Sequence, residues 1–198
     1  MAVVKFKTLF VGKNPRGTPY VEQALFACRE AARLGLAPGT SGNVSVRTPR
    51  GFLVSAANTA LGTLGRNEFV EVVGLERMSS DMVVSVYGTR DPSSETPFHW
   101  AIYRARPDVD VILHLHDDVV RSVPASFLDI PFTWTQQRSG TWALVDEVLL
   151  LLRQNPKAKF FILKGHGVVS MGKTAKAATN LAAKMHRRAK HYLKKEAG

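Results

Sequence analysis

The chain has 198 residues, 45% of them hydrophobic and 22% charged, which is ordinary for one globular domain with a sizeable core. No apolar run approaches the roughly 20 residues that a transmembrane helix needs, which argues against an integral membrane protein. The single Cys28 cannot form an intramolecular disulfide, and residues 1–17, expected to be an N-terminal arm or strand, lack the apolar core of a secretory signal peptide. We therefore expect one cytoplasmic domain over residues 1–198.

The formal net charge of +11 is concentrated near the C-terminus. Residues 173–198 carry eight Lys or Arg and one acid, Glu196, and such a run can contact nucleic-acid phosphates. Apolar residues nevertheless repeat there at helical spacing: Ala178, Leu181, Ala182, Met185, Ala189 and Tyr192. We interpret the segment as a helix with one packed face and one solvated basic face, so nucleic acid is not an expected partner. Its positive field would attract small anionic substrates.

The first half of the chain alternates helix and strand signals. Thr18 and Pro19 suit a helix cap and the first helical position, and apolar residues continue at helical spacing to about Gly35. The polar loop 37–43 follows, and then come the expected strands, 44–46, 52–54, 69–73 and 82–87. A small polar loop beside a strand can present N–H groups and hydroxyls to a phosphate, although an ordinary connecting loop has the same composition.

A helix and a buried strand are expected within residues 93–116. Residues 93–94 can cap the helix, and Pro107 should end it. Its core-facing residues would be Phe98, Ile102 and Ala105. The apolar, β-branched run 109–113 then predicts the strand.

Three histidines and one glutamate are candidates for metal binding and acid–base chemistry. His114 and His116 are two apart, so on a strand both side chains leave the same face. His166 lies between two glycines, which allow close approach of the backbone, and Glu95 lies in a polar loop. Three imidazoles with an open coordination position are typical of a catalytic zinc site. The alternative is an ordinary structural role for histidines near a strand end.

The last third of the chain predicts further mixed structure. We expect a short helix after residues 117–118, a strand at 130–135, a helix at 142–152 and a strand at 159–163. Strands and helices alternate without regular βαβ units, which favours a largely antiparallel sheet flanked by helices.

Several of these motifs, in this order, resemble those of the class II aldolase/adducin family over residues 20–190. The matching segments are 39–47, Ser93-Ser94-Glu95, 103–108, His114-Leu115-His116 and His166-Gly167. The resemblance implies an α/β fold of three layers, α/β/α, with a central, largely antiparallel sheet. It also implies a homotetramer with active sites at the subunit interfaces.

The resemblance also assigns roles to residues. His114, His116 and His166 would hold Zn²⁺ or another divalent cation, and Glu95 would move the proton on the donor carbon. The phosphate of a small sugar phosphate would be bound by Thr40, Gly42, Asn43, Ser93 and Ser94. The implied reaction is aldol formation or cleavage of a carbon–carbon bond through an enediolate.

Other activities of the family remain alternatives. The motif of its epimerases resembles Ser-Ser-Asp, whereas this chain has Ser93-Ser94-Glu95, so the glutamate favours an aldolase. Related dehydratases and decarboxylases can also carry the glutamate. Adducin heads are structural modules without the metal histidines, and this chain keeps all three, so that alternative is less favoured.

Two segments depart from the family's pattern. Residues 55–65 lack the usual Pro-containing turn of the second phosphate wall, although Asn58 tolerates the left-handed backbone that such a turn needs. Between His116 and His166 there is no tyrosine to protonate the leaving aldehyde oxygen, so the general acid is not identified. Trp134, Gln137 and Arg138 should lie where a neighbouring subunit closes the site.

Overall fold

An eight-stranded sheet runs through the molecule in the order β1-β5-β4-β3-β2-β6-β8-β7. The computed structural model describes residues 6–15, 17–78 and 81–196. The strands are β1 (Lys7–Gly12), β2 (Asn43–Thr48), β3 (Gly51–Ser55), β4 (Phe69–Met78), β5 (Asp81–Tyr87), β6 (Val111–Leu115), β7 (Phe160–Leu163) and β8 (Gly167–Gly172). Neighbouring strands are antiparallel except β1 and β5, which are parallel. The expected largely antiparallel sheet is therefore confirmed.

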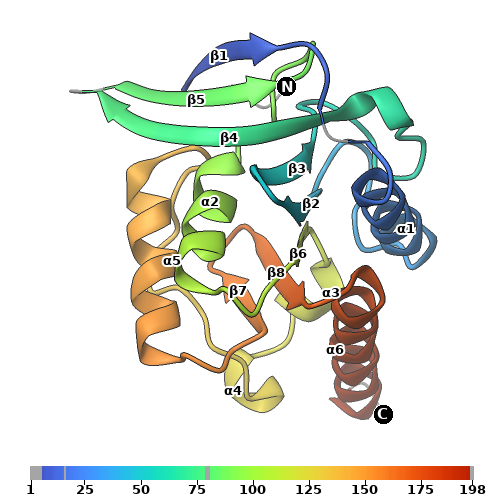
Figure 1. Ribbon diagram of the computed structural model, residues 1–198. Helices are drawn as coiled ribbons and strands as arrows, with labels where there is room; N and C mark the ends of the chain where they lie inside the picture. The colour runs from blue at the N-terminus through green and yellow to red at the C-terminus, as the bar shows by residue number, and fades with distance from the viewer. Residues whose placement is uncertain (1–5, 16, 79–80, 197–198) are drawn as a thin grey trace.

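Helices cover both faces of this sheet, which gives three layers (Figure 1). The helices are α1 (Tyr20–Arg33), α2 (Thr96–Ala105), α3 (Asp118–Arg121), α4 (Ala125–Leu128), α5 (Trp142–Gln154) and α6 (Ala175–Glu196), with a short 3₁₀ helix at Arg66–Glu68. One apolar core lies under α1 and α6, and a second lies under α2 and α5. The expected three-layer α/β/α fold is confirmed.

Successive side chains of a central strand enter the two cores in alternation. In β6, Val111 and Leu113 belong to the core under α1 and α6, whereas Ile112 belongs to the core under α2 and α5. Successive strand residues point to opposite faces, so His114 follows Ile112 onto the α2 side. Its ring lies edge-on to that of Phe98 of α2, with the ring centres 5.7 Å apart.

The helix beginnings differ from expectation by one to three residues. Helix α1 starts at Tyr20, and Thr18 makes no capping hydrogen bond to it. Helix α2 starts at Thr96 with Glu95 at the cap position and no side-chain cap bond, so neither Ser93 nor Ser94 caps it. Instead the Ser93 hydroxyl accepts a hydrogen bond from the Glu95 N–H, which forms a tight turn ahead of the helix.

Two expectations about the packed segments were wrong. The segment 130–135 is not a strand: it forms one isolated parallel bridge, Phe132 to Ile162. Beyond it the Trp134 N–H and the Thr135 hydroxyl donate to Glu147 of α5, which turns the chain away from the sheet. Phe98 and Ile102 are buried as expected, whereas Ala105, the last residue of α2, is exposed.

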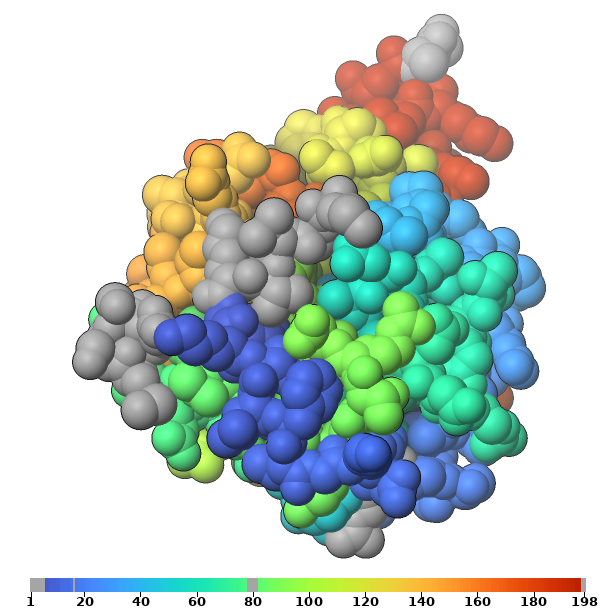
Figure 2. Space-filling view, turned by 90° about the horizontal axis from the view of Figure 1, so that it is seen from above, coloured from blue at the N-terminus to red at the C-terminus, as the bar shows by residue number. Residues whose placement is uncertain are grey.

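The described residues begin near the edge strand β1 and end with the long helix α6. Strand β1 confirms a strand in the N-terminal segment, while residues 1–5 lie outside the described ranges. Viewed from above, β1 (blue) lies across the surface, and the C-terminal part of α6 (red) projects beyond the rest of the molecule (Figure 2). The expected apolar face of α6 is confirmed by buried Ala178, Ala182, Met185 and Ala189. None of the helices in the described ranges is long and apolar enough to cross a membrane.

Candidate active site

A hollow of about 270 Å³ lies where β2, β6 and β8 meet the start of α2. All nine residues singled out from the sequence line it: Thr40, Gly42, Asn43, Ser93, Ser94, Glu95, His114, His116 and His166. These residues come from four separate segments of the chain, which the strand order β2-β6-β8 brings together. A larger hollow of about 680 Å³ near α4 contains no histidine and none of these residues.

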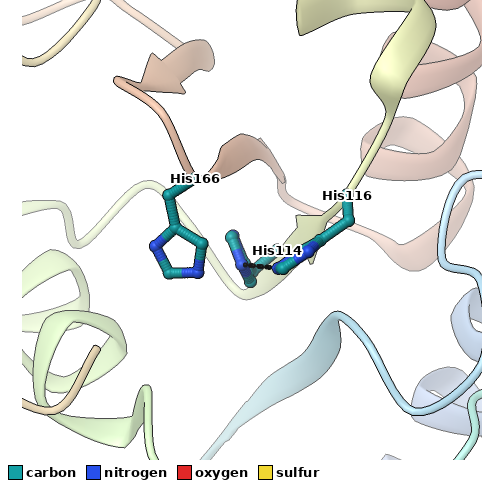
Figure 3. A group of neighbouring side chains, drawn as sticks. All are labelled: His114, His116 and His166. Atoms are coloured by element: carbon teal, nitrogen blue, oxygen red, sulfur yellow. Dashed lines mark hydrogen bonds between the residues drawn. The ribbon is translucent and has the colours of Figure 1, made fainter. Parts of the chain in front are cut away.

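The three imidazoles converge on one point of this hollow (Figure 3). His114 is the fourth residue of β6, and His116 follows directly after the strand. Their Nε2 atoms are 3.0 Å apart, and one ligand nitrogen from each of the three histidines lies within 4.8 Å of the others. The shared strand face expected for the His-x-His pair is therefore what the structure shows.

Glycines make this convergence sterically feasible. A Cβ at Gly167 would lie 2.6 Å from the His114 ring and 2.6 Å from the Leu115 carbonyl oxygen. Gly165 has a φ of +67°, in the left-handed region that favours glycine. The turn between β7 and β8 thus brings His166 close to β6 only because both of its neighbours are glycine, as expected from the sequence.

Glu95 completes the cluster from the N-terminus of α2. Its Oε2 lies 2.8 Å from His114 Nε2, and its Oε1 lies 3.1 Å from His166 Nε2. The Asn43 amide donates a longer hydrogen bond, 3.3 Å, to Oε2. Burial alone would raise the pKa of the Glu95 carboxyl, but the nearby His114 and His166 outweigh it and hold the pKa well below its usual range. Glu95 is therefore a carboxylate at neutral pH.

The surroundings shift the pKa values of His116 and His166 in opposite directions. Burial, reinforced by the charges of His114 and His166, lowers the pKa of His116 to about 4, so its ring is neutral at pH 7 and carries a free lone pair. Burial would also lower the pKa of His166, but its hydrogen bond to Glu95 and the charge of Glu95 raise it overall. The buried carboxylate thus attracts a positive charge to this point, as a proton or as a cation.

The other wall of the hollow is small and polar. Gly42 has a φ of +76°, and a Cβ there would lie 2.8 Å from the His114 carbonyl oxygen, so the loop passes close to β6. Ser93 and Ser94 are buried just ahead of α2, whose positive N-terminal end therefore adjoins the hollow. Hydroxyls, N–H groups and a helix N-terminus are groups that bind phosphate.

Segment 56–59 and two serines complete the lining of the hollow. Segment 56–59 closes the hollow, held by hydrogen bonds such as Ala57 N–H to the Asp91 carbonyl oxygen. Asn58 has a φ of +58°, which confirms the expected left-handed turn position. Ser41 and Ser139 also line the hollow. Ser139 lies in the loop after the mispredicted strand, where residue pattern carried no signal for it.

The segment expected at a subunit boundary lies beside the hollow but does not line it. Trp134 is 61% exposed and Arg138 is exposed, whereas the side-chain amide of Gln136 donates to the Gly165 carbonyl oxygen. The hollow's lining contains no tyrosine. The described part of the chain therefore places no phenolic hydroxyl in this lining.

The donor set of the cluster fits a divalent cation of the zinc type. Three imidazole nitrogens and one carboxylate oxygen are the ligands that Zn²⁺ takes in proteins. Two imidazole nitrogens 3.0 Å apart, with a carboxylate oxygen 2.8 Å from one of them, form an arrangement that a shared cation would stabilise.

The fold and the site define a three-layer α/β protein with a candidate metal centre beside a polar wall of serine, threonine, asparagine and glycine residues. The chain matches the model of the Class II Aldolase and Adducin N-terminal domain over residues 22–193, and it belongs to that family.

Individual relatives agree with this placement. The chain is 30% identical to a 5-methylthioribulose-1-phosphate/5-deoxyribulose-1-phosphate aldolase of Rhodospirillum rubrum, over 84% of this chain and 76% of the relative. It is also 30% identical to an L-fuculose phosphate aldolase of Escherichia coli, over 86% of this chain and 81% of the relative. A solved L-fuculose 1-phosphate aldolase has the same fold, with a TM-score of 0.74, 20% identity and coverage of 92% and 89% of the two chains.

Proposed function

We propose that this protein is a metal-dependent aldolase that forms or cleaves a carbon–carbon bond in a small sugar phosphate. The observation that carries the proposal is the convergence of three histidines and a buried carboxylate at a polar hollow of about 270 Å³. Relatives named as aldolases of sugar phosphates support the substrate class. A cytoplasmic location goes with this proposal, because Cys28 is buried and free.

His114, His116 and His166 would hold the cation, with zinc as our first expectation. The chemistry that a bound cation supplies there is Lewis-acid polarisation of a ketose carbonyl. Two features of the chain suit cation binding. His116 is neutral at pH 7, and the glycines on either side of His166 leave room for the three imidazoles to converge.

Glu95 would carry the proton on the carbon next to that carbonyl. It is ionised at neutral pH, and its carboxylate lies at the edge of the histidine cluster, within reach of a substrate atom bound there. A carboxylate in this position can act as a general base, a contribution worth roughly 10²–10⁴-fold in rate.

Thr40, Gly42, Asn43, Ser93 and Ser94 would hold the substrate phosphate. Ser93 and Ser94 immediately precede α2, so a phosphate near them would also face the positive end of that helix. Segment 56–59 would form the second side of the same subsite.

A homotetramer with shared active sites is part of the proposal. The hollow has no tyrosine to serve as an acid, and the neighbouring segment exposes two aromatic side chains, Phe132 at 44% and Trp134 at 61%. Exposed aromatic residues beside an incomplete site are suited to contact with another subunit.

The variant Glu95→Gln tests the assignment of the base. The amide cannot accept a proton at neutral pH, so exchange of the carbon-bound proton of dihydroxyacetone phosphate with deuterated water should fall by roughly 10²–10⁴-fold. Metal content should stay near that of the wild type. NMR measures the exchange, and elemental analysis measures the metal.

Glu22→Gln is the matched control, because Glu22 pairs with Arg66 away from the hollow. Exchange at the wild-type rate in Glu95→Gln would remove Glu95 from this role. A wild-type protein that neither exchanges the proton nor releases an aldehyde from any ketose phosphate would refute the proposed function.

A further inference from the structure

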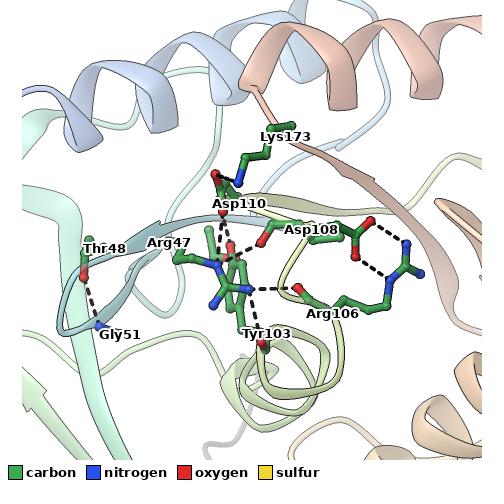
Figure 4. A network of polar contacts seen from close by, with 10 residues as sticks. Arg47, Thr48, Gly51, Tyr103, Arg106, Asp108, Asp110 and Lys173 are labelled. Atoms are coloured by element: carbon green, nitrogen blue, oxygen red, sulfur yellow. Dashed lines mark hydrogen bonds and ion pairs between the residues drawn. The ribbon is translucent and has the colours of Figure 1, made fainter. Parts of the chain in front are cut away.

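Strand β2 places three polar side chains against helix α2, and Figure 4 shows one of them, Arg47. Asn43, Ser45 and Arg47 are two residues apart, so they share the face of β2 that looks toward α2. Asn43 bonds Glu95 at the start of the helix, Ser45 bonds its middle, and Arg47 bonds its end. The helix is thus held along its whole length by hydrogen bonds to one strand.

The middle contact is a buried chain of three groups. His99 Nδ1 is 2.7 Å from Ser45 Oγ, which is 2.8 Å from the Tyr103 hydroxyl, and that hydroxyl donates to the Asp110 carbonyl oxygen at 3.3 Å. His99 and Ser45 are completely buried. Burial lowers the pKa of His99 to about 3, so the ring is neutral and has one N–H.

One proton arrangement satisfies all three contacts. His99 Nδ1–H donates to Ser45, the Ser45 hydroxyl donates to Tyr103, and the Tyr103 hydroxyl donates to the Asp110 carbonyl oxygen. Each donor is used once, and His99 Nε2 is left as a bare acceptor instead of a buried N–H without a partner. A directed chain of this kind allows one rotational setting of the helix.

The end contact fixes the other terminus of α2. The Arg47 guanidinium donates to the carbonyl oxygens of Tyr103 and Arg106 at 3.0 and 2.9 Å, and it lies over the Tyr103 ring. Arg47 also pairs with Asp110, which in turn pairs with Lys173 ahead of α6. These contacts, visible in Figure 4, prevent α2 from sliding along its axis.

We propose that Ser45, His99 and Tyr103 are positioning residues that set the rotation of α2 and thereby hold the Glu95 carboxylate at the histidine cluster. The inference rests on the proposed function of Glu95 as the base. Glu95, His99 and Tyr103 are spaced by four residues, so they lie above one another on a single face of the helix. A rotation of α2 would move all three together, and Glu95 would leave His114 and His166.

Apolar packing alone would not give the same control. Phe98 and Ile102 bury α2 against the sheet, but apolar contacts are non-directional and tolerate small rotations. A misplacement of about 1 Å at a reacting group can cost about 100-fold in rate. Burying two hydroxyls and an imidazole is unfavourable unless they are paired, and here all three are paired. Their hydrogen bonds are directional, so they restrict the rotation of α2 in a way that apolar contacts do not.

Two variants at position 99 test the proposal. His99→Leu breaks the hydrogen-bond chain between His99, Ser45 and Tyr103. His99→Asn instead offers a side-chain amide near the position of Nδ1 that can donate to Ser45. His99→Leu and Ser45→Ala should lower kcat for the proton exchange by about 10- to 100-fold, with little change in KM or in metal content. His99→Asn should restore most of kcat. Ile102→Val, a buried change on the same helix but outside the chain, is the control for stability.

A measurement that does not depend on activity separates this inference from the proposed function. Crystal structures of the wild type and His99→Leu should show the Glu95 carboxylate withdrawn from His114 in the variant, with the three histidines in place. A carboxylate that stays within hydrogen-bond distance of His114, or a kcat equal to that of Ile102→Val, would overturn the inference. An inactive wild type would instead refute the function, and the crystal structures would still decide the positioning.

Discussion

His99 shows, at the scale of single residues, which parts of the site were accessible from the sequence. The spacing of Phe98 and Ile102 identified the buried face of the helix correctly, and the histidine pattern identified the cluster. The burial of His99 was not predicted, because a polar residue enters a core only with a partner, and its partner Ser45 lies 54 positions away. Residue spacing within one segment reports nothing about that pairing.

The buried His99 should make stability sensitive to acid. Its folded pKa of about 3 lies below the ordinary value of 6.5, so between these values the unfolded chain binds the proton and the folded chain does not. The wild type should therefore lose stability as the pH falls below 6.5, by about 1.4 kcal/mol per pH unit from this group, and show no contribution from it above 6.5. Urea unfolding of the wild type and of His99→Asn, from pH 7.5 to 5, measures the difference.

The direction in which this stability difference changes with pH tests whether the buried His99 ring is neutral in the folded protein. The stability gap between wild type and His99→Asn should shift against the wild type as the pH falls. A gap that stays constant across the range would mean that His99 has the same pKa in the folded and unfolded chains, which would contradict its burial as a neutral ring.

Helix α6 illustrates what could be predicted at the scale of elements. Its apolar face follows from spacing alone, but its link to the segment that carries His114 and His116 does not. His186 of α6 lies 2.8 Å from Asp117, which directly follows His116 and caps α3 through the N–H groups of Val119 and Val120. The C-terminal helix thereby anchors the loop that carries His116.

The variant His186→Leu should destabilise the fold by about 1–3 kcal/mol, because Asp117 is buried and loses a hydrogen-bond partner. Urea unfolding at fixed protein concentration measures this. His191→Leu is the control on the same helix, since His191 is exposed and should change stability by less than about 0.5 kcal/mol. Equal effects of the two substitutions would show that the contact with Asp117 contributes nothing.

At the scale of the whole molecule, the order of the strands decides where the site forms. Strand β6 lies between β2 and β8, so His114 is next to Asn43 on one side and Val169 on the other. The resemblance of short motifs predicted this assembly, and the three-layer fold agrees with it. The left-handed turn at Asn58 in the second wall was expected from the resemblance, whereas the lining by Ser139 was not predicted, because it depends on how a loop of unfamiliar sequence packs over the finished sheet.

Metal content tests the central claim most directly. Protein prepared without chelator should contain about one divalent cation per chain, because three imidazoles and a carboxylate converge on one point. His116→Ala should lower that content markedly, whereas His191→Ala, an exposed histidine of α6, should not. Elemental analysis of the three proteins gives the answer: a wild type without metal, or a His116→Ala variant with as much metal as the wild type, would contradict the account.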